Sequence, residues 1–327
     1  MPNQMPRRVD SRILLLLLVI ALAFAAVGPF VMKAGQMRLL TEIFVMLAMA
    51  QMWNLLAGYG GLMSMGHQAF VGVGAYVLFA CANYLHISPY FALPAAPLIG
   101  GLLAAGLAPF LFRLRDAYFS IGIWVIAEII AILVGKSTLL GRQYGMVFTG
   151  MRDLNRAWFA PITFWLASGV AIGSIVVVYL VLRSRVGLGL MAVRDNDVAA
   201  ASLGIDVWRV RLIAFVISGA GVSLAGAIFY MSSLQVSPTS GFDPNWVVQM
   251  LFITIIGGIG RIEGPIIGTV IFFGLREYVA DAGNWYLILM GIVGVGIMLV
   301  APSGIWGALS KRISLEIFSV RRAPPNA

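Results

Sequence analysis

The chain has 327 residues, of which 61% are hydrophobic and only 11% are charged. About 25% of the residues of an ordinary soluble domain are charged, so a soluble fold of this size would lack the polar surface that it needs. The formal net charge is +9, but the basic residues lie between apolar runs, which favours contact with anionic lipid over nucleic acid. The single cysteine, Cys81, excludes an intrachain disulfide.

The apolar residues form runs that are long enough to cross a bilayer as helices. A helix needs about 20 apolar residues to cross roughly 30 Å of hydrocarbon. Only helices and closed barrels satisfy every backbone group in lipid, and these runs lack the alternation of barrel strands. The sequence predicts an all-α polytopic membrane protein with about ten transmembrane helices. They are expected near residues 13–32, 39–57, 67–85, 92–112, 117–135, 162–182, 210–231, 246–260, 264–281 and 285–301.

The distribution of basic residues predicts the orientation. Most of the 22 Lys and Arg residues fall on the side of the N-terminus, which indicates that both termini are cytoplasmic. We expect a cytoplasmic N-terminus over residues 1–12, a membrane domain over 13–309 and a cytoplasmic tail over 310–327. The alternative is a cleaved signal peptide ending near Ala25 and Ala26. It is disfavoured because cleavage would leave an odd number of spans and because another apolar run follows directly after Arg38.

A glycine-rich segment over residues 57–70 interrupts the apolar pattern after the second predicted helix. Its glycines would break or unwind a helix, and irregular backbone is tolerated at membrane depth where protein or a water-filled cavity shelters it. Interrupted membrane segments are also typical of transport paths. We therefore place Gly60, Gly61, Ser64 and His67 on a candidate translocation path, with tight packing alone as the alternative.

Glu128 lies near the middle of a predicted span. A charge at the centre of a membrane helix costs about 3 kcal/mol on insertion scales, so Glu128 is expected to face the bundle interior or water. It is a candidate for binding a substrate ammonium group on the translocation path. The alternative is a protonated or paired carboxyl group with a structural role.

The longest cytoplasmic segment runs from Arg183 to Arg211 and contains signals for a short helix. Asp195, Asn196 and Asp197 are N-cap residue types, three alanines follow, and Gly204 suits the end of a helix. The pattern predicts about two helical turns, either packed on the chain's own bundle or docked on a cytoplasmic partner with Arg194, Asp197 and the small alanines exposed. The candidate coupling residues within segment 184–209 are Arg194, Asp195, Asn196, Asp197, Ala200, Leu203 and Gly204.

A second glycine-rich segment begins at Gly257 and Gly258, which are also assigned to the candidate path. Gly260, Gly264 and Gly268 then follow at a spacing of four, which suits close contact between helices. We expect no metal site, because His67 and His86 lack neighbouring ligands. Gly135-Lys136-Ser137-Thr138 lacks the earlier glycine of a phosphate-binding loop, so no ATPase site is expected. The sequence has no HExxH motif, no GxSxG motif and no convincing catalytic constellation, so the chain is not expected to be an enzyme.

Four segments in order resemble the LivM-type permeases of branched-chain amino-acid ABC importers. They are the glycine-rich segment 57–70, the cytoplasmic segment 194–218, the late glycine segment 257–268 and the ending Pro302-Ser303-Gly304 with Gly307. The resemblance implies a bacterial inner-membrane permease that works by alternating access, and it implies that residues 194–204 form the coupling helix. It also implies a LivH-type permease partner, two cytoplasmic subunits that bind the ATP, and a periplasmic binding protein, with no cofactor in this chain.

The expected substrate is a branched-chain amino acid, with other substrates left open. The outer segment Leu140-Gly141-Arg142-Gln143-Tyr144-Gly145-Met146 departs from the short glycine-rich loop of the family. Similar permeases import urea, short amides or aromatic carboxylates, and a secondary transporter or channel that works alone is a further alternative.

Overall fold

A computed structural model describes residues 7–8, 11–149, 156–279, 285–301, 303–313 and 315–316. The expected terminal segments 1–12 and 310–327 therefore lie largely outside the described residues, as does Pro302. Within these ranges the chain is almost entirely helical. The longer helices are α1 (Ser11–Val31), α2 (Ala34–Asn54), α3 (Gln68–Tyr84), α5 (Ala95–Leu111), α6 (Ala117–Lys136), α7 (Arg156–Arg183), α8 (Arg185–Asp195), α10 (Val207–Ser233), α12 (Asn245–Gly257), α13 (Glu263–Val279), α14 (Trp285–Val300) and α15 (Gly304–Ile313).

Short elements connect these helices. They are α4 (Pro89–Ala92), α9 (Asp197–Ser202), α11 (Pro238–Gly241), the π-helix η1 (Leu55–Tyr59) and the 3₁₀ helix η2 (Arg142–Tyr144). Two small sheets complete the structure: β1 (Arg7–Arg8) pairs in parallel with β4 (Leu315–Glu316), and β2 (Met146–Val147) pairs antiparallel with β3 (Gln235–Val236).

The helices confirm a multi-pass membrane protein. Six described segments are long and apolar enough to cross a membrane: Ala34–Tyr59, Pro89–Leu111, Ala117–Lys136, Ala157–Arg183, Val207–Ser233 and Gly291–Ser310. Two shorter apolar helices, Leu18–Val31 and Gln68–Tyr84, lie among them. Every range expected from the sequence overlaps one of the helices, although helix α7 begins earlier than expected, at Arg156.

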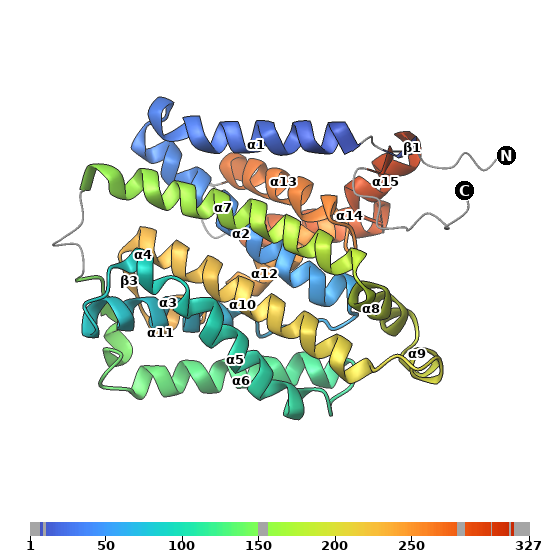
Figure 1. Ribbon diagram of the computed structural model, residues 1–327, viewed down its shortest axis with the longest axis horizontal. Helices are drawn as coiled ribbons and strands as arrows, with labels where there is room; N and C mark the ends of the chain where they lie inside the picture. The colour runs from blue at the N-terminus through green and yellow to red at the C-terminus, as the bar shows by residue number, and fades with distance from the viewer. Residues whose placement is uncertain are drawn as a thin grey trace.

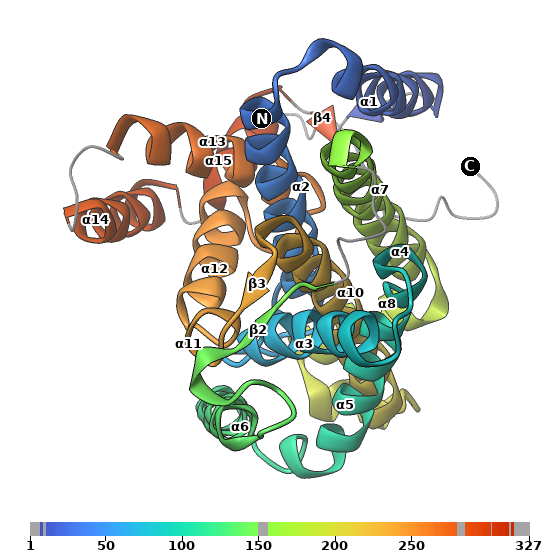
Figure 2. The same ribbon diagram turned by 90° about the vertical axis from the view of Figure 1, so that its left-hand side faces the viewer.

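The long helices lie side by side along the long axis of the molecule, so that the molecule has two distinct ends (Figure 1). Helices α8, α9 and α15 and the start of α1 lie at one end, called the α9 end. Helices α4 and α11 and strand β3 lie at the opposite end, called the β3 end. Turning the molecule shows α2, α10 and α3 near its centre, with α1, α6 and α14 at the periphery (Figure 2).

Helix α10 forms the centre of the core and packs against α2, α3, α5 and α7. Glycines permit its close contact with α3. A Cβ atom on Gly226 would lie 2.6 Å from the carbonyl oxygen of Val71, and one on Gly74 would overlap the carbonyl oxygen of Ser223. The Ser223 hydroxyl also donates a hydrogen bond to the Phe70 carbonyl, 2.9 Å away. Small residues and hydroxyl groups therefore hold these two helices together, as is common inside membranes.

We predict that Gly74→Ala lowers the stability of the protein, because a methyl group has no room against the α10 backbone. The expected loss is about 1–3 kcal/mol, the usual cost of overpacking. Gly173→Ala is the matched control, because a Cβ atom at this position in α7 meets nothing within 4 Å. The measurement is the thermal unfolding midpoint of the detergent-purified variants. Equal midpoints for both variants would contradict the close contact between α3 and α10.

Candidate functional site

The short helix expected between residues 183 and 211 is present as α9. Asn196 is its N-cap, and the Asn196 side chain accepts a hydrogen bond of 3.0 Å from the backbone N–H of Ala199. Gly204 follows the helix with a φ of +83°, a left-handed conformation that glycine adopts without strain. The N–H of Ile205 then returns to the carbonyl of Ala200, which closes the end of the helix.

Two details of this segment differ from the expectation. Arg194 and Asp195 belong to the preceding helix α8, which the glycines at 187 and 189 obscured in the sequence. Ala200 is buried rather than exposed, because this side of α9 rests on the chain's own helices. Ala199 and Ala201 are exposed as expected, and the large apolar side chains exposed beside them are Val198 and Leu203, at 71% and 81% exposure.

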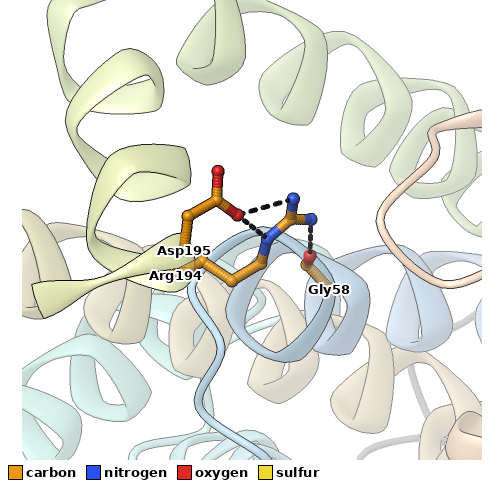
Figure 3. Close-up of polar contacts among 3 residues, drawn as sticks. All are labelled: Gly58, Arg194 and Asp195. Carbon is orange, nitrogen blue, oxygen red and sulfur yellow. Dashed lines mark hydrogen bonds and ion pairs between the residues drawn. The ribbon is translucent and has the colours of Figure 1, made fainter.

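Arg194 points back from α8 toward the end of the second helix (Figure 3). Its Nη1 donates a hydrogen bond of 2.8 Å to the carbonyl oxygen of Gly58. Its Nε and Nη2 donate to Oδ1 of Asp195, at 3.3 and 3.2 Å. The guanidinium group is thus oriented by a neighbouring carboxylate while it holds a backbone carbonyl of another element. The planar fork of arginine donors suits this double role.

The first glycine-rich segment forms the receiving surface for Arg194. Helix α2 continues as the π-helix η1, whose residues are all buried, and the backbone is irregular from Gly60 to His67. Gly61 has a φ of +70°, and a Cβ atom there would lie 3.2 Å from Cγ of Arg194. Gly61 therefore provides both the turn and the space for the arginine side chain. The predicted break in the helix is confirmed.

The second glycine-rich segment packs against the first. The Asn54 Oδ1 accepts a hydrogen bond of 2.9 Å from the N–H of Gly260, and its Nδ2 donates to the carbonyl of Arg261 at 2.8 Å. Gln51 donates to the carbonyl of Ile262 at 2.6 Å. A Cβ atom on Gly58 would lie 2.5 Å from the nitrogen of Gly260. The structure thus brings the two glycine motifs and Arg194 into one junction, which sequence spacing alone did not predict.

Ser64 and His67 lie in a buried polar network beside this junction, and both side chains are fully buried. The His67 Nδ1 is 2.6 Å from Oγ of Ser64, and its Nε2 is 2.8 Å from Oγ of Ser218. Ser218 donates its proton to the carbonyl of Met52, so it accepts from Nε2–H of His67. In the neutral ring with its proton on Nε2, Nδ1 accepts from the Ser64 hydroxyl. This network joins the end of α2 to α3 and α10.

Glycines of the late motif also pack closely. A Cβ atom on Gly257 would overlap the carbonyl oxygen of Gly264, so that α12 and α13 meet at backbone contact. Gly258 has a φ of +130°, which favours glycine. The packing interpretation therefore has direct support for Gly257, and the assignment of both residues to a translocation path stays a prediction.

Glu128 lies outside the interior of the chain's own bundle, so of the two expected surroundings only water remains, and its assignment to the translocation path stays a prediction. The buried residues of α6 are Phe119, Ile123, Ala127 and Gly135, and Glu128 is exposed on the opposite side of the helix. Insertion cost predicts that a carboxylate avoids lipid, but it does not specify that the chain's own helices provide the shelter.

A cavity of about 910 Å³ lies at the β3 end. Its wall combines Arg38 and Asp243 with hydroxyl and amide groups and with the aromatic rings of Phe229, Trp246 and Phe252. None of the seven candidate path residues is among the described residues that line it. Sequence reasoning missed this site, although the polar residues between 233 and 249 were a possible signal.

Comparison with known proteins finds relatives that match most of the chain. The chain is 26% identical to the high-affinity branched-chain amino acid transport system permease protein LivM of Salmonella typhimurium, over 93% of this chain and 76% of the relative. It is also 26% identical to LivM of Escherichia coli, over 92% and 77%. A probable branched-chain amino acid transport permease protein LivH of Methanocaldococcus jannaschii is 28% identical, over 74% and 82%.

No solved structure matches the chain significantly. The profile of one protein family, described as the permease component of the branched-chain amino acid transport system, matches residues 35–301. This range includes both glycine motifs, Arg194 and helix α9. The chain therefore belongs to the family of branched-chain amino acid transport permeases and is a permease subunit of an ABC importer.

Proposed function

We propose that this subunit moves branched-chain amino acids across the inner membrane of a bacterium, driven by two cytoplasmic ATPase subunits that dock at the α9 end. A second permease subunit of the LivH type completes the membrane unit, and a periplasmic binding protein delivers the substrate at the β3 end. The observation that carries the proposal is the hydrogen bond from Arg194 to Gly58, which connects the exposed helix α9 region to the centre of the bundle.

Helix α9 has the properties of a docking element. Val198 and Leu203 are exposed apolar side chains at the tip of the molecule, and exposed apolar groups mark interaction sites when they cluster. The helix is fixed to the bundle by the buried Ala200 and by an ion pair of 3.7 Å between Asp197 and Arg211 at the start of α10. A force on α9 therefore moves α8 and α10 with it rather than bending a loop.

The proposed topology has about ten spans with both termini in the cytoplasm. In support, α15, α9 and the start of α1 lie at the same end of the molecule (Figure 1). The α9 end also carries a cluster of basic residues, as expected of the cytoplasmic side. They are Arg183, Arg185, Arg194, Arg209, Arg211 and Arg261.

The proposed stroke begins when ATP closes the two ATPase subunits. Their movement displaces α9 and α8, and Arg194 carries the displacement to the end of α2 and the late glycine segment. Alternating access then results from rigid-body movement of packed helices, a common form of switching. Directionality follows from a difference in substrate affinity between the two states.

We predict that Leu203→Asp abolishes binding of the ATPase subunits, because it places a charge on the exposed apolar tip beside α9. Leu139→Asp is the matched control, since Leu139 is similarly exposed, at 70% against 81%, but lies near the opposite end. The measurement is co-purification of the ATPases with the tagged permease. Undiminished co-purification of the Leu203→Asp complex would contradict docking at α9.

We predict that Arg194→Ala leaves the ATPases bound but lowers leucine uptake per ATP hydrolysed by roughly tenfold in liposomes. Loss of a charged hydrogen bond is worth about 1.5 kcal/mol, which corresponds to that factor. Arg209→Ala is the control, because Arg209 pairs only locally with Asp206 among the ion pairs described. If the Arg194→Ala variant takes up as much leucine per ATP hydrolysed as the wild type, the hydrogen bond to Gly58 does not transmit the movement of the ATPase subunits.

A further inference from the structure

Helix α6 is a peripheral helix with two different sides. It lies at the edge of the molecule in both views (Figures 1 and 2), and only a minor part of it is buried by its own chain. Its inner side packs through Phe119, Ile123 and Ala127. Its outer side carries exposed residues at helical spacings of three and four. These residues are Ile121, Val125, Glu128 and Ile132.

Glu128 distinguishes this side from the other uncovered helix surfaces. The exposed residues of α5 include Leu98, Leu102 and Phe110, and those of α14 are likewise apolar, so both surfaces suit lipid. Within the described candidate spans, Glu128 is the only ionisable residue that is both near mid-span and exposed. Hydrocarbon offers no hydrogen-bond donor to a carboxylate, so Glu128 requires protein or a water-filled space against it, and a neighbouring subunit can provide either.

We propose that the outer side of α6 is the contact surface for the second permease subunit, which presents a hydrogen-bond donor to Glu128 at mid-membrane depth. This inference rests on the proposed function, because it needs an importer with two different permeases. Salmonella typhimurium has both a LivM and a LivH, each named a permease protein of the high-affinity branched-chain amino acid transport system, and both match most of this chain. A permease partner has apolar membrane helices that can pack against Ile121, Val125 and Ile132 on the outer side of α6.

The segment that follows α6 also favours contact with the second permease subunit. Tyr144, in the 3₁₀ helix η2, is 95% exposed and lines the cavity at the β3 end together with Met146. An uncovered tyrosine is typical of a surface that another protein covers. A permease subunit seated on α6 and η2 would therefore also close one side of the cavity, so that the substrate path borders both subunits.

The proposal and its alternative predict opposite effects of removing the charge. If α6 faces lipid, Glu128→Leu replaces a costly group with a favourable one, and the protein becomes at least as stable in the membrane. If α6 faces the second permease, Glu128→Leu leaves the partner's donor without an acceptor and weakens the complex. Glu128→Gln keeps a hydrogen-bonding side chain of the same shape and is expected to retain most of the association.

The experiment uses the complete importer, with an affinity tag on the second permease. A photo-activated benzophenone side chain placed at 125 or 132 is expected to cross-link to the second permease, while one placed at 98 or 102 in α5 reacts with lipid. Glu128→Leu is expected to lower co-purification of this chain with the tagged subunit at least tenfold, and Glu128→Gln less than threefold.

Cross-links from 125 and 132 to lipid alone, or to another copy of this chain, would overturn the proposal, as would unchanged co-purification of Glu128→Leu. Leucine uptake by the same wild-type complex is measured in parallel. ATP-driven uptake without the cross-link refutes the α6 surface and leaves the proposed function intact. A cross-link without leucine uptake supports the α6 surface and counts against the proposed substrate.

Discussion

The hydrogen bond between Arg194 and the carbonyl of Gly58 depends on an unusual ending of helix α2. In an α-helix that continues, each carbonyl is used by a later N–H group. Here the π-helix η1 and the turn at Gly60 and Gly61 end that pattern, and the N–H groups of Gly60 and Leu62 both turn to the carbonyl of Leu56. The regular helical hydrogen bonds have ended at this point, so the carbonyl of Gly58 accepts a hydrogen bond from the Arg194 guanidinium group.

Helix α2 connects this junction to the other end of the molecule. Arg38, near its start, lines the cavity at the β3 end, and Gly58, just beyond its end, accepts the Arg194 hydrogen bond. Much of the helix is buried, and an ion pair between Glu42 and Arg276 fixes it to α13 near the β3 end. Because buried, close-packed helices move as rigid bodies, α2 is one mechanical connection between the α9 end and the cavity, beside α10, which pairs with α9 through Arg211 and lines the cavity through Phe229.

Sequence reasoning succeeded where the signal was local. The cap at Asn196, the stop at Gly204 and the helix break after residue 57 follow from side-chain and backbone chemistry within a few residues. It failed where the outcome depended on distant segments. The contact of Arg194 with Gly58, the hydrogen bonds of Asn54 between the two glycine motifs and the cavity at the β3 end all join residues far apart in the chain.

His67 and Glu128 are two polar side chains in membrane segments that have different surroundings in this structure. Both were assigned to one translocation path, His67 because it lies in an interrupted membrane segment and Glu128 because a charge avoids lipid. His67 satisfies that requirement within the chain, through Ser64 and Ser218. Glu128 lies on the uncovered side of α6. Avoidance of lipid therefore requires protein or water around the side chain, and it does not specify which chain provides that shelter. In a subunit of a larger assembly, an exposed carboxylate at mid-span is better interpreted as the mark of a neighbouring subunit than as a fault in the fold.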